Sequence, residues 1–140
     1  LRIDRTAAQV WPLIGDPGRI QEWFPGIESC TVETTDEGTT RTVTLATGIP
    51  LVEHVVTNDP IARRFQYKIA GGVFKEHVGT VDVIDLGDGT CLGVYSTDAL
   101  PDVMALVIGG ATGDALENIK ALAEHGRLAS VAGDAEEEIH

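Results

Sequence analysis

The sequence predicts one small α+β domain, in which a curved antiparallel sheet of about seven strands wraps around a long C-terminal helix and encloses a pocket. Three observations predict this fold. Residues 27–99 alternate apolar and polar side chains between short glycine- and proline-rich turns, as consecutive antiparallel strands do. Two short helical patterns precede that region, and one long helical pattern follows it. The length of 140 residues suits a single hydrophobic core.

The first part of the chain predicts a strand end and two short helices. Residues 1–4 have the composition of a strand end. Thr6 and Gln9 have the spacing of a capping box, so we expect a helix over 7–14. Asp16, followed by a proline, is typical of a helix start, and this second short helix ends before a Pro-Gly pair.

The middle of the chain predicts a series of strands separated by turns. The segment 62–70 is the clearest, with Phe65, Tyr67 and Ile69 on one face and polar residues between them. The expected strands are 27–35, 39–47, 51–58, 62–70, 75–86 and 90–99. The turns between them are short, so neighbouring strands are expected to be antiparallel.

The long helix is expected to begin at Pro101 and to end at Gly126. Its first half is rich in small residues, among them Gly109, Gly110 and Gly113. Each glycine in a helix interior costs about 1 kcal/mol relative to alanine. This composition predicts a kink or a local break near Gly109-Gly110, or a backbone that runs close to a neighbour or a ligand.

The domain is expected to span residues 1–126, and the acidic segment 127–140 is expected to form a flexible tail. The formal net charge is −12, and only ten lysines and arginines are present, so binding to nucleic acid is not expected. No apolar run reaches the roughly 18 residues of a membrane span.

Two cysteines, Cys30 and Cys91, fall within expected strands and outside any metal-ligand spacing. They are either reduced thiols or partners in one disulfide. We expect reduced thiols and a cytoplasmic protein, since no signal peptide is visible. The protein is expected to be a monomer or a homodimer.

The alternation also predicts which side chains face the pocket. If Phe65, Tyr67 and Ile69 point inward, neighbouring strands contribute every second side chain, and the helices close the space. The side chains expected around it are Trp23, Phe24, Arg41, Val43, Leu45, Leu51, Glu53, Val55, Phe65, Tyr67, Ile69, His77, Val81, Leu92, Val94, Ser96, Val103, Leu106, Val107 and Gly110. Most of these are apolar, as in binding sites for small molecules.

Each polar group of the expected pocket has two interpretations. Arg41 and Glu53 either pair with each other across neighbouring strands or contact a ligand, and pairing is favoured because an unpaired buried charge is costly. His77 is either a general acid or base or a structural histidine. Tyr67 either orients a ligand oxygen or extends its hydroxyl to water. Ser96 is the remaining polar candidate.

Known catalytic and cofactor motifs are absent from the sequence. There is no Gly-x-Ser-x-Gly elbow, no phosphate-binding loop and no grouping of metal-ligating residues. We therefore expect no cofactor and no metal ion.

The order of elements, with Val10-Trp11 in the first helix and Trp23-Phe24-Pro25-Gly26 after the second, resembles the polyketide cyclase/dehydrase branch of the START-like (SRPBCC, birch pollen allergen-like) helix-grip superfamily. The resemblance covers about residues 1–125. It implies a helix-grip fold around a ligand cavity.

Within that superfamily, segments 41–51 and 90–101 and the pair Gly71-Gly72 are similar to plant abscisic acid receptors. The resemblance implies a gate over the ligand at 48–51, which adds Ile49 and Pro50 to the candidate site, and a ligand contact at Glu53. The lysine that pairs with the hormone's carboxylate corresponds to Phe24 here, and the latch motif is replaced by residues 73–75. These differences argue against a hormone-receptor role.

Two functions follow as hypotheses. The first is binding of a hydrophobic small molecule, such as a lipid, polyketide or aromatic compound, in the cavity. The alternative is a polyketide cyclase or dehydratase that folds its substrate in the cavity, with His77, Glu53 and Tyr67 in acid–base roles. A third, weaker idea is an interaction protein whose gate loop moves on ligand binding.

Overall fold

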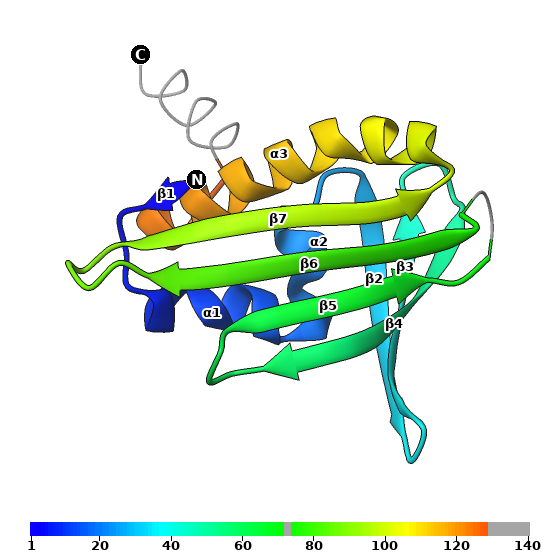
Figure 1. The fold of residues 1–140 in the computed structure, drawn as a ribbon, viewed down its shortest axis with the longest axis horizontal. Helices are drawn as coiled ribbons and strands as arrows, with labels where there is room; N and C mark the ends of the chain where they lie inside the picture. Colours follow the sequence, from blue (N-terminus) through cyan, green and yellow to red (C-terminus); the bar gives the residue numbers. More distant parts are fainter. Residues whose placement is uncertain (72–73, 129–140) are drawn as a thin grey trace.

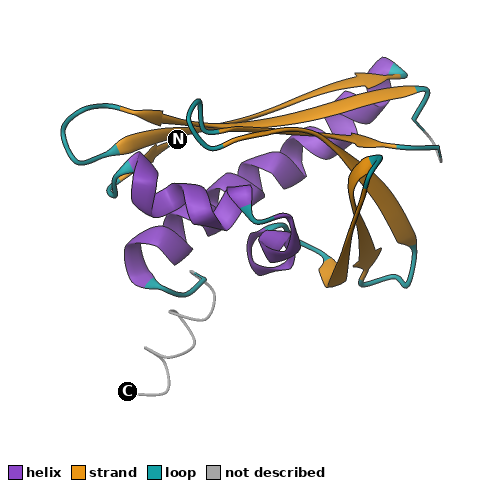
Figure 2. Cartoon of the chain, turned by 90° about the horizontal axis from the view of Figure 1, so that it is seen from below, coloured by secondary structure: helices purple, strands orange, loops and turns teal. Residues whose placement is uncertain are grey.

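The computed structural model describes residues 1–71 and 74–128, with the backbone alone at 104–108. Its strands form one sheet, and its helices lie on one side of that sheet (Figures 1 and 2). The elements in chain order are β1 (Arg2–Ile3), α1 (Ala7–Gly15), a 3-10 turn (Pro17–Arg19), α2 (Ile20–Trp23), β2 (Ile27–Thr35), β3 (Gly38–Leu45), β4 (Pro50–Asp59), β5 (Arg64–Ile69), β6 (Glu76–Asp85), β7 (Cys91–Leu100) and α3 (Asp102–His125).

The sheet has seven strands in the order β1-β7-β6-β5-β4-β3-β2, and every neighbouring pair is antiparallel. Figure 2 shows that the sheet is bent, so that its β2–β3 end folds down beside the helices. The helices occupy the concave side, and α3 runs along it. This is the predicted helix-grip α+β fold.

The predicted start of α1 is confirmed by its hydrogen bonds. The Thr6 hydroxyl accepts the N–H of Gln9, and the Gln9 side chain accepts the N–H of Thr6. Val10 and Ile14 then point into the core on one face of the helix. The cap at Asp16 is also present, because its side chain accepts the N–H of Gly18.

The predicted inward face of β7 is wrong by one residue. Val81 is buried and lies directly opposite Tyr95, so Tyr95 shares the inward face. Val94 and Ser96 therefore point to the outer face, and Leu92 does too. Alternation in this strand was ambiguous because both of its faces carry apolar residues, and only the register with β6 distinguishes them.

The predicted break in the long helix is absent, since α3 is continuous from Asp102 to His125. A Cβ atom added at Gly109, Gly110 or Gly113 would meet no described atom within 4 Å, so these glycines do not mark a close backbone approach. Gly126 ends the helix in the left-handed conformation, with φ at +72°, and its N–H bonds to the Leu122 carbonyl.

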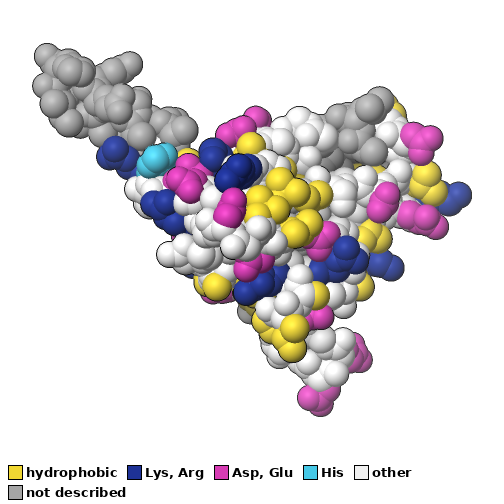
Figure 3. Space-filling view, turned by 60° about the vertical axis from the view of Figure 1, so that its left-hand side comes forward, with side chains coloured by type: hydrophobic (Ala, Val, Ile, Leu, Met, Phe, Trp, Pro, Cys, Tyr) yellow, Lys and Arg dark blue, Asp and Glu magenta, His cyan; other side chains and the backbone are white. Residues whose placement is uncertain are grey.

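Within the described residues, no helix is long and apolar enough to span a membrane. Cys30 and Cys91 are free thiols, and burial raises the pKa of each. Acidic and basic side chains are interspersed on the face shown in Figure 3. Most of the acidic tail expected at 127–140, residues 129–140, lies outside the described residues, as does half of the Gly71-Gly72 turn.

Candidate functional site

An apolar pocket of about 240 Å³ lies on the concave side of the sheet, between strands β2–β6 and the helices α2 and α3. Its lining consists of nine apolar side chains and three polar ones. The lining residues are Ile20, Phe24, Ile27, Val43, Leu45, Leu51, Glu53, Tyr67, Ile69, Phe74, His77 and Ala111. A mostly apolar lining with a few polar groups is typical of a small-molecule site.

Glu53 lines the pocket and is held by a buried ion pair. The Nε–H of Arg41 donates to its Oε1 at 2.7 Å, and the Arg41 side chain is 1% exposed. The two residues lie opposite each other on β3 and β4, as the alternation predicted. Burial raises the pKa of Glu53, and the neighbouring guanidinium acts in the opposite direction.

A backbone carbonyl and two aromatic rings also contact the Arg41 guanidinium. Its Nη1–H donates to the Pro17 carbonyl at 3.2 Å. The rings of Phe65 and Tyr67 lie 5.0 and 4.9 Å from its central carbon, which is a cation–π arrangement. Arg41 therefore holds Glu53 from the side away from the pocket and does not itself line the pocket.

Tyr67 forms the second polar group, through a hydrogen bond between its hydroxyl and that of Tyr95. Burial raises the pKa of both phenols, so both are neutral near pH 7. In such a pair one hydroxyl donates to the other, and the proton of the acceptor is free to bond elsewhere. Tyr95 was not among the expected pocket residues, because only the register of β7 against β6 places it opposite Val81.

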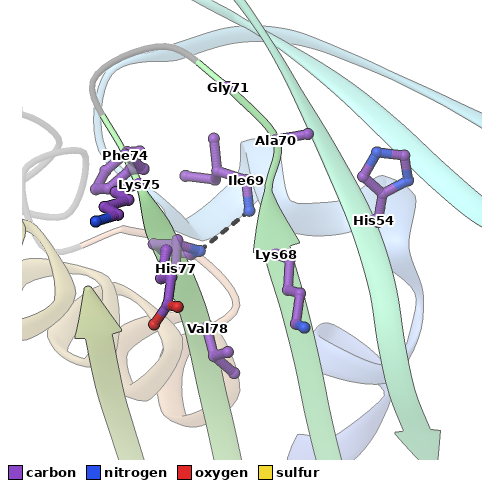
Figure 4. Close-up of a pocket in the computed structure, with 10 residues that line it drawn as sticks. His54, Lys68, Ile69, Ala70, Gly71, Phe74, Lys75, His77 and Val78 are labelled. Carbon is purple, nitrogen blue, oxygen red and sulfur yellow. Dashed lines mark hydrogen bonds between the residues drawn. The ribbon is translucent and has the colours of Figure 1, made fainter. Parts of the chain in front are cut away.

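His77 is the third polar group, and its protonation state follows from its hydrogen bond. Its Nδ1 accepts the backbone N–H of Ile69 at 3.1 Å, as Figure 4 shows. The neutral ring then carries its proton on Nε2, where it can donate but not accept. Burial lowers the pKa of His77, which favours this neutral form.

Many of the expected residues line the pocket, and the others lie elsewhere in the structure. Those that line it are Phe24, Val43, Leu45, Leu51, Glu53, Tyr67, Ile69 and His77. Those that are buried nearby without lining it are Trp23, Arg41, Phe65 and Val81, and the partly buried Val55 packs against the same core. Those that lie away from it are Ile49, Pro50, Leu92, Val94, Ser96, Val103 and Gly110. The side chains of Leu106 and Val107 fall outside the described ones.

The expected gate residues Ile49 and Pro50 lie on the surface, and Ile49 is 54% exposed. A tight turn explains this, because the N–H of Leu45 bonds to the Ile49 carbonyl and the N–H of Gly48 bonds to the Leu45 carbonyl. Strand β4 then starts at Pro50, and its alternation sends Leu51 inward and Pro50 outward.

Four lining residues were missed by the sequence analysis: Ile20, Ile27, Phe74 and Ala111. Ile20 lies within the expected second short helix, for which no inward face was assigned. Phe74 follows the double glycine, where alternation cannot be read. No group of three or more histidine, cysteine or carboxylate side chains that could hold a metal occurs among the described residues.

Comparison with known proteins identifies the family. The sequence profile of the family described as "Polyketide cyclase / dehydrase and lipid transport" matches residues 1–124. No curated protein matches this chain.

Solved structures support the fold. XoxI from Bacillus cereus is 21% identical with a TM-score of 0.78, covering 89% of this chain and 92% of that chain. Norcoclaurine synthase from Thalictrum flavum is 20% identical with a TM-score of 0.69, covering 89% and 84%. The di-domain ARO/CYC BexL from the BE-7585A biosynthetic pathway is 16% identical with a TM-score of 0.67, covering 86% and 43%. At these identities the likeness shows the fold alone, whereas the family profile covers almost the whole domain. The chain belongs to the polyketide cyclase/dehydrase and lipid transport family.

Proposed function

We propose that this protein binds an apolar small molecule, such as a lipid, polyketide or aromatic compound, in the pocket between the sheet and the helices. The observation that carries this proposal is the lining, in which nine of twelve side chains are apolar. The volume of about 240 Å³ is just below the ~300 Å³ at the lower end for typical ligand sites, which favours a compact ligand.

The test places a large side chain in the pocket and compares it with the same side chain at the neighbouring position of the strand. Leu51→Trp places a large ring in the pocket, whereas Val52→Trp places the same ring on the outer face, where Val52 is 41% exposed. We expect Leu51→Trp to weaken binding of the neutral probe N-phenyl-1-naphthylamine by about tenfold or more, and Val52→Trp to leave it unchanged.

Fluorescence titration measures the probe affinity, and circular dichroism checks that both variants are folded. Equal affinities for the two variants, or no binding of the probe to the unmodified protein, would contradict the binding proposal.

A second candidate function is cyclisation or dehydration of a polyketide-like substrate. It is favoured by the convergence of Glu53, Tyr67 and His77 on one pocket, and by the family description and the ARO/CYC name of BexL. A carboxyl group with a raised pKa suits proton transfer, and the Nε2–H of His77 suits donation to a ketone oxygen. Holding a flexible chain in a reactive shape would itself accelerate ring closure.

For this reaction, Glu53→Gln and His77→Ala are each expected to lower turnover of a poly-β-ketone thioester by about tenfold or more. His125→Ala is the control, because His125 is exposed at the C-terminal end of α3. Product analysis by mass spectrometry measures turnover. If both pocket variants react as fast as the control, these residues have no acid–base role.

A further inference from the structure

A groove of about 560 Å³ lies on the outer face of the sheet, over the ends of β5 and β6 (Figure 4). Outward-facing side chains of β4 and β5, His54 and Lys68, form one side of it. Its full lining is His54, Lys68, Ile69, Ala70, Gly71, Phe74, Lys75, Glu76, His77 and Val78. Ile69, Phe74 and His77 also line the inner pocket, so the same three residues separate the two spaces.

The hydrogen-bond ladder of the sheet is interrupted where these three residues lie. The ladder between β5 and β6 ends at the pair Tyr67 and Gly79, although both strands continue. Lys68 and Ile69 still pair with β4, and residues 76–78 still pair with β7. The two strands therefore lose their mutual pairing while each keeps its other neighbour, which leaves an opening in the hydrogen-bond ladder between them.

The side chain of His77 occupies this opening. Its Nδ1 accepts the N–H of Ile69, the backbone group that faces the gap from β5. Its ring packs between the rings of Tyr67 and Phe74, with centroid distances of 5.4 and 4.9 Å. One side-chain hydrogen bond thus takes the place of the backbone ladder at this point.

We propose that the opening between β5 and β6 is the entrance through which the apolar ligand reaches the pocket, and that His77 closes it. This inference rests on the proposed binding function. It assigns the outer groove as the first contact site of the ligand. It also assigns His77 a role in the rate of ligand exchange, separate from any role in affinity.

The test measures association and dissociation of N-phenyl-1-naphthylamine by stopped-flow fluorescence. The probe is neutral, so the charges of Lys68, Lys75 and Glu76 at the groove do not steer it. His77→Ala is expected to raise both rate constants by about fivefold or more, while the dissociation constant changes much less. A residue that only lined the pocket would change the dissociation rate and the affinity together.

A second variant closes the opening. Lys68→Cys with Val78→Cys places a thiol on each side of the gap, and a short thiol cross-linker joins them in a Cys30→Ser background. The matched control joins Arg64→Cys to Asp82→Cys, which lie opposite each other in the paired part of the same two strands. We expect the first cross-link to slow both rate constants by about tenfold, and the control cross-link to leave them unchanged.

Probe binding with unchanged rates in both His77→Ala and the Lys68–Val78 cross-link would overturn the entrance while leaving the binding function in place. Failure of the unmodified protein to bind the probe would overturn both.

Discussion

At the scale of single residues, Gly79 determines where the Tyr67 side chain can lie. A Cβ atom at position 79 would be 2.5 Å from Cζ of Tyr67, which is far inside van der Waals contact. Tyr67 can therefore cross β6 at this point and reach the Tyr95 hydroxyl on β7 only because residue 79 has no side chain. The polar end of the pocket depends on a residue that contributes no chemical group.

Gly79→Ala is expected to displace the Tyr67 ring and to lower the free energy of unfolding by about 1–3 kcal/mol, because the added methyl group overpacks the core. Urea unfolding measures the change, and near-UV circular dichroism reports the tyrosines. Gly113→Ala is the matched control. Gly113 is exposed on α3 with open space around it, so alanine there is expected to stabilise the protein by about 1 kcal/mol. Unchanged stability of Gly79→Ala would contradict this placement of the ring.

At the scale of elements, the pairing of β3 with β4 places Arg41 directly beside Glu53 in the core. The desolvation of each charge is offset by the other, and neither is tolerated alone. The same register orients Glu53 so that it lines the pocket. Two strands therefore share one polar site, and a shift of the register by one residue would place the two side chains on opposite faces of the sheet.

Arg41→Met is expected to lower the free energy of unfolding by about 3–5 kcal/mol, because it leaves the Glu53 carboxyl buried without its partner. The double variant Arg41→Met with Glu53→Leu is expected to lose less than Arg41→Met alone, since no buried charge remains. Urea unfolding of Arg41→Met, of Glu53→Leu and of the double variant gives the coupling energy of the pair in a double-mutant cycle. Losses that simply add would mean that the two side chains do not depend on each other.

At the scale of the whole molecule, the stability of the fold is linked to pH through His77. The folded protein lowers the pKa of this histidine by burying it, whereas the unfolded chain has the ordinary value of 6.5. Below pH 6.5 His77 binds a proton in the unfolded state but not in the folded state, so protonation favours unfolding. The contribution of His77 to stability is complete above pH 6.5 and is lost as the pH falls toward the lowered pKa.

His77→Asn is expected to remove this dependence, because an asparagine oxygen can accept the Ile69 N–H but does not titrate. Urea unfolding between about pH 5 and pH 7 compares the variant with the unmodified protein, whose stability should fall more steeply toward pH 5. His54→Ala, which alters an exposed histidine, is expected to keep the steeper fall. Identical slopes in His77→Asn and the unmodified protein would contradict a buried neutral His77.

The sequence by itself determined the element order, the capped start of α1 and the inward face of β5. These features depend on local periodicity and on capping chemistry, and neighbouring residues contain all of that information. For Arg41 and Glu53 the cost of a buried charge favoured a pair, which the register of β3 against β4 brings together. The sequence also identified Glu53, Tyr67 and His77 as the polar groups of the pocket, because each lies on the clear inward face of its strand.

Only the tertiary structure decided the features that depend on how one strand meets another. The register of β7 against β6 placed Tyr95 inside and Ser96 outside, although the strand carries apolar residues on both faces. The tight turn before β4 left Ile49 and Pro50 on the surface. The early end of the β5–β6 ladder created the opening that His77 fills. Pairing across strands is a property of distant segments, so no local pattern reports it.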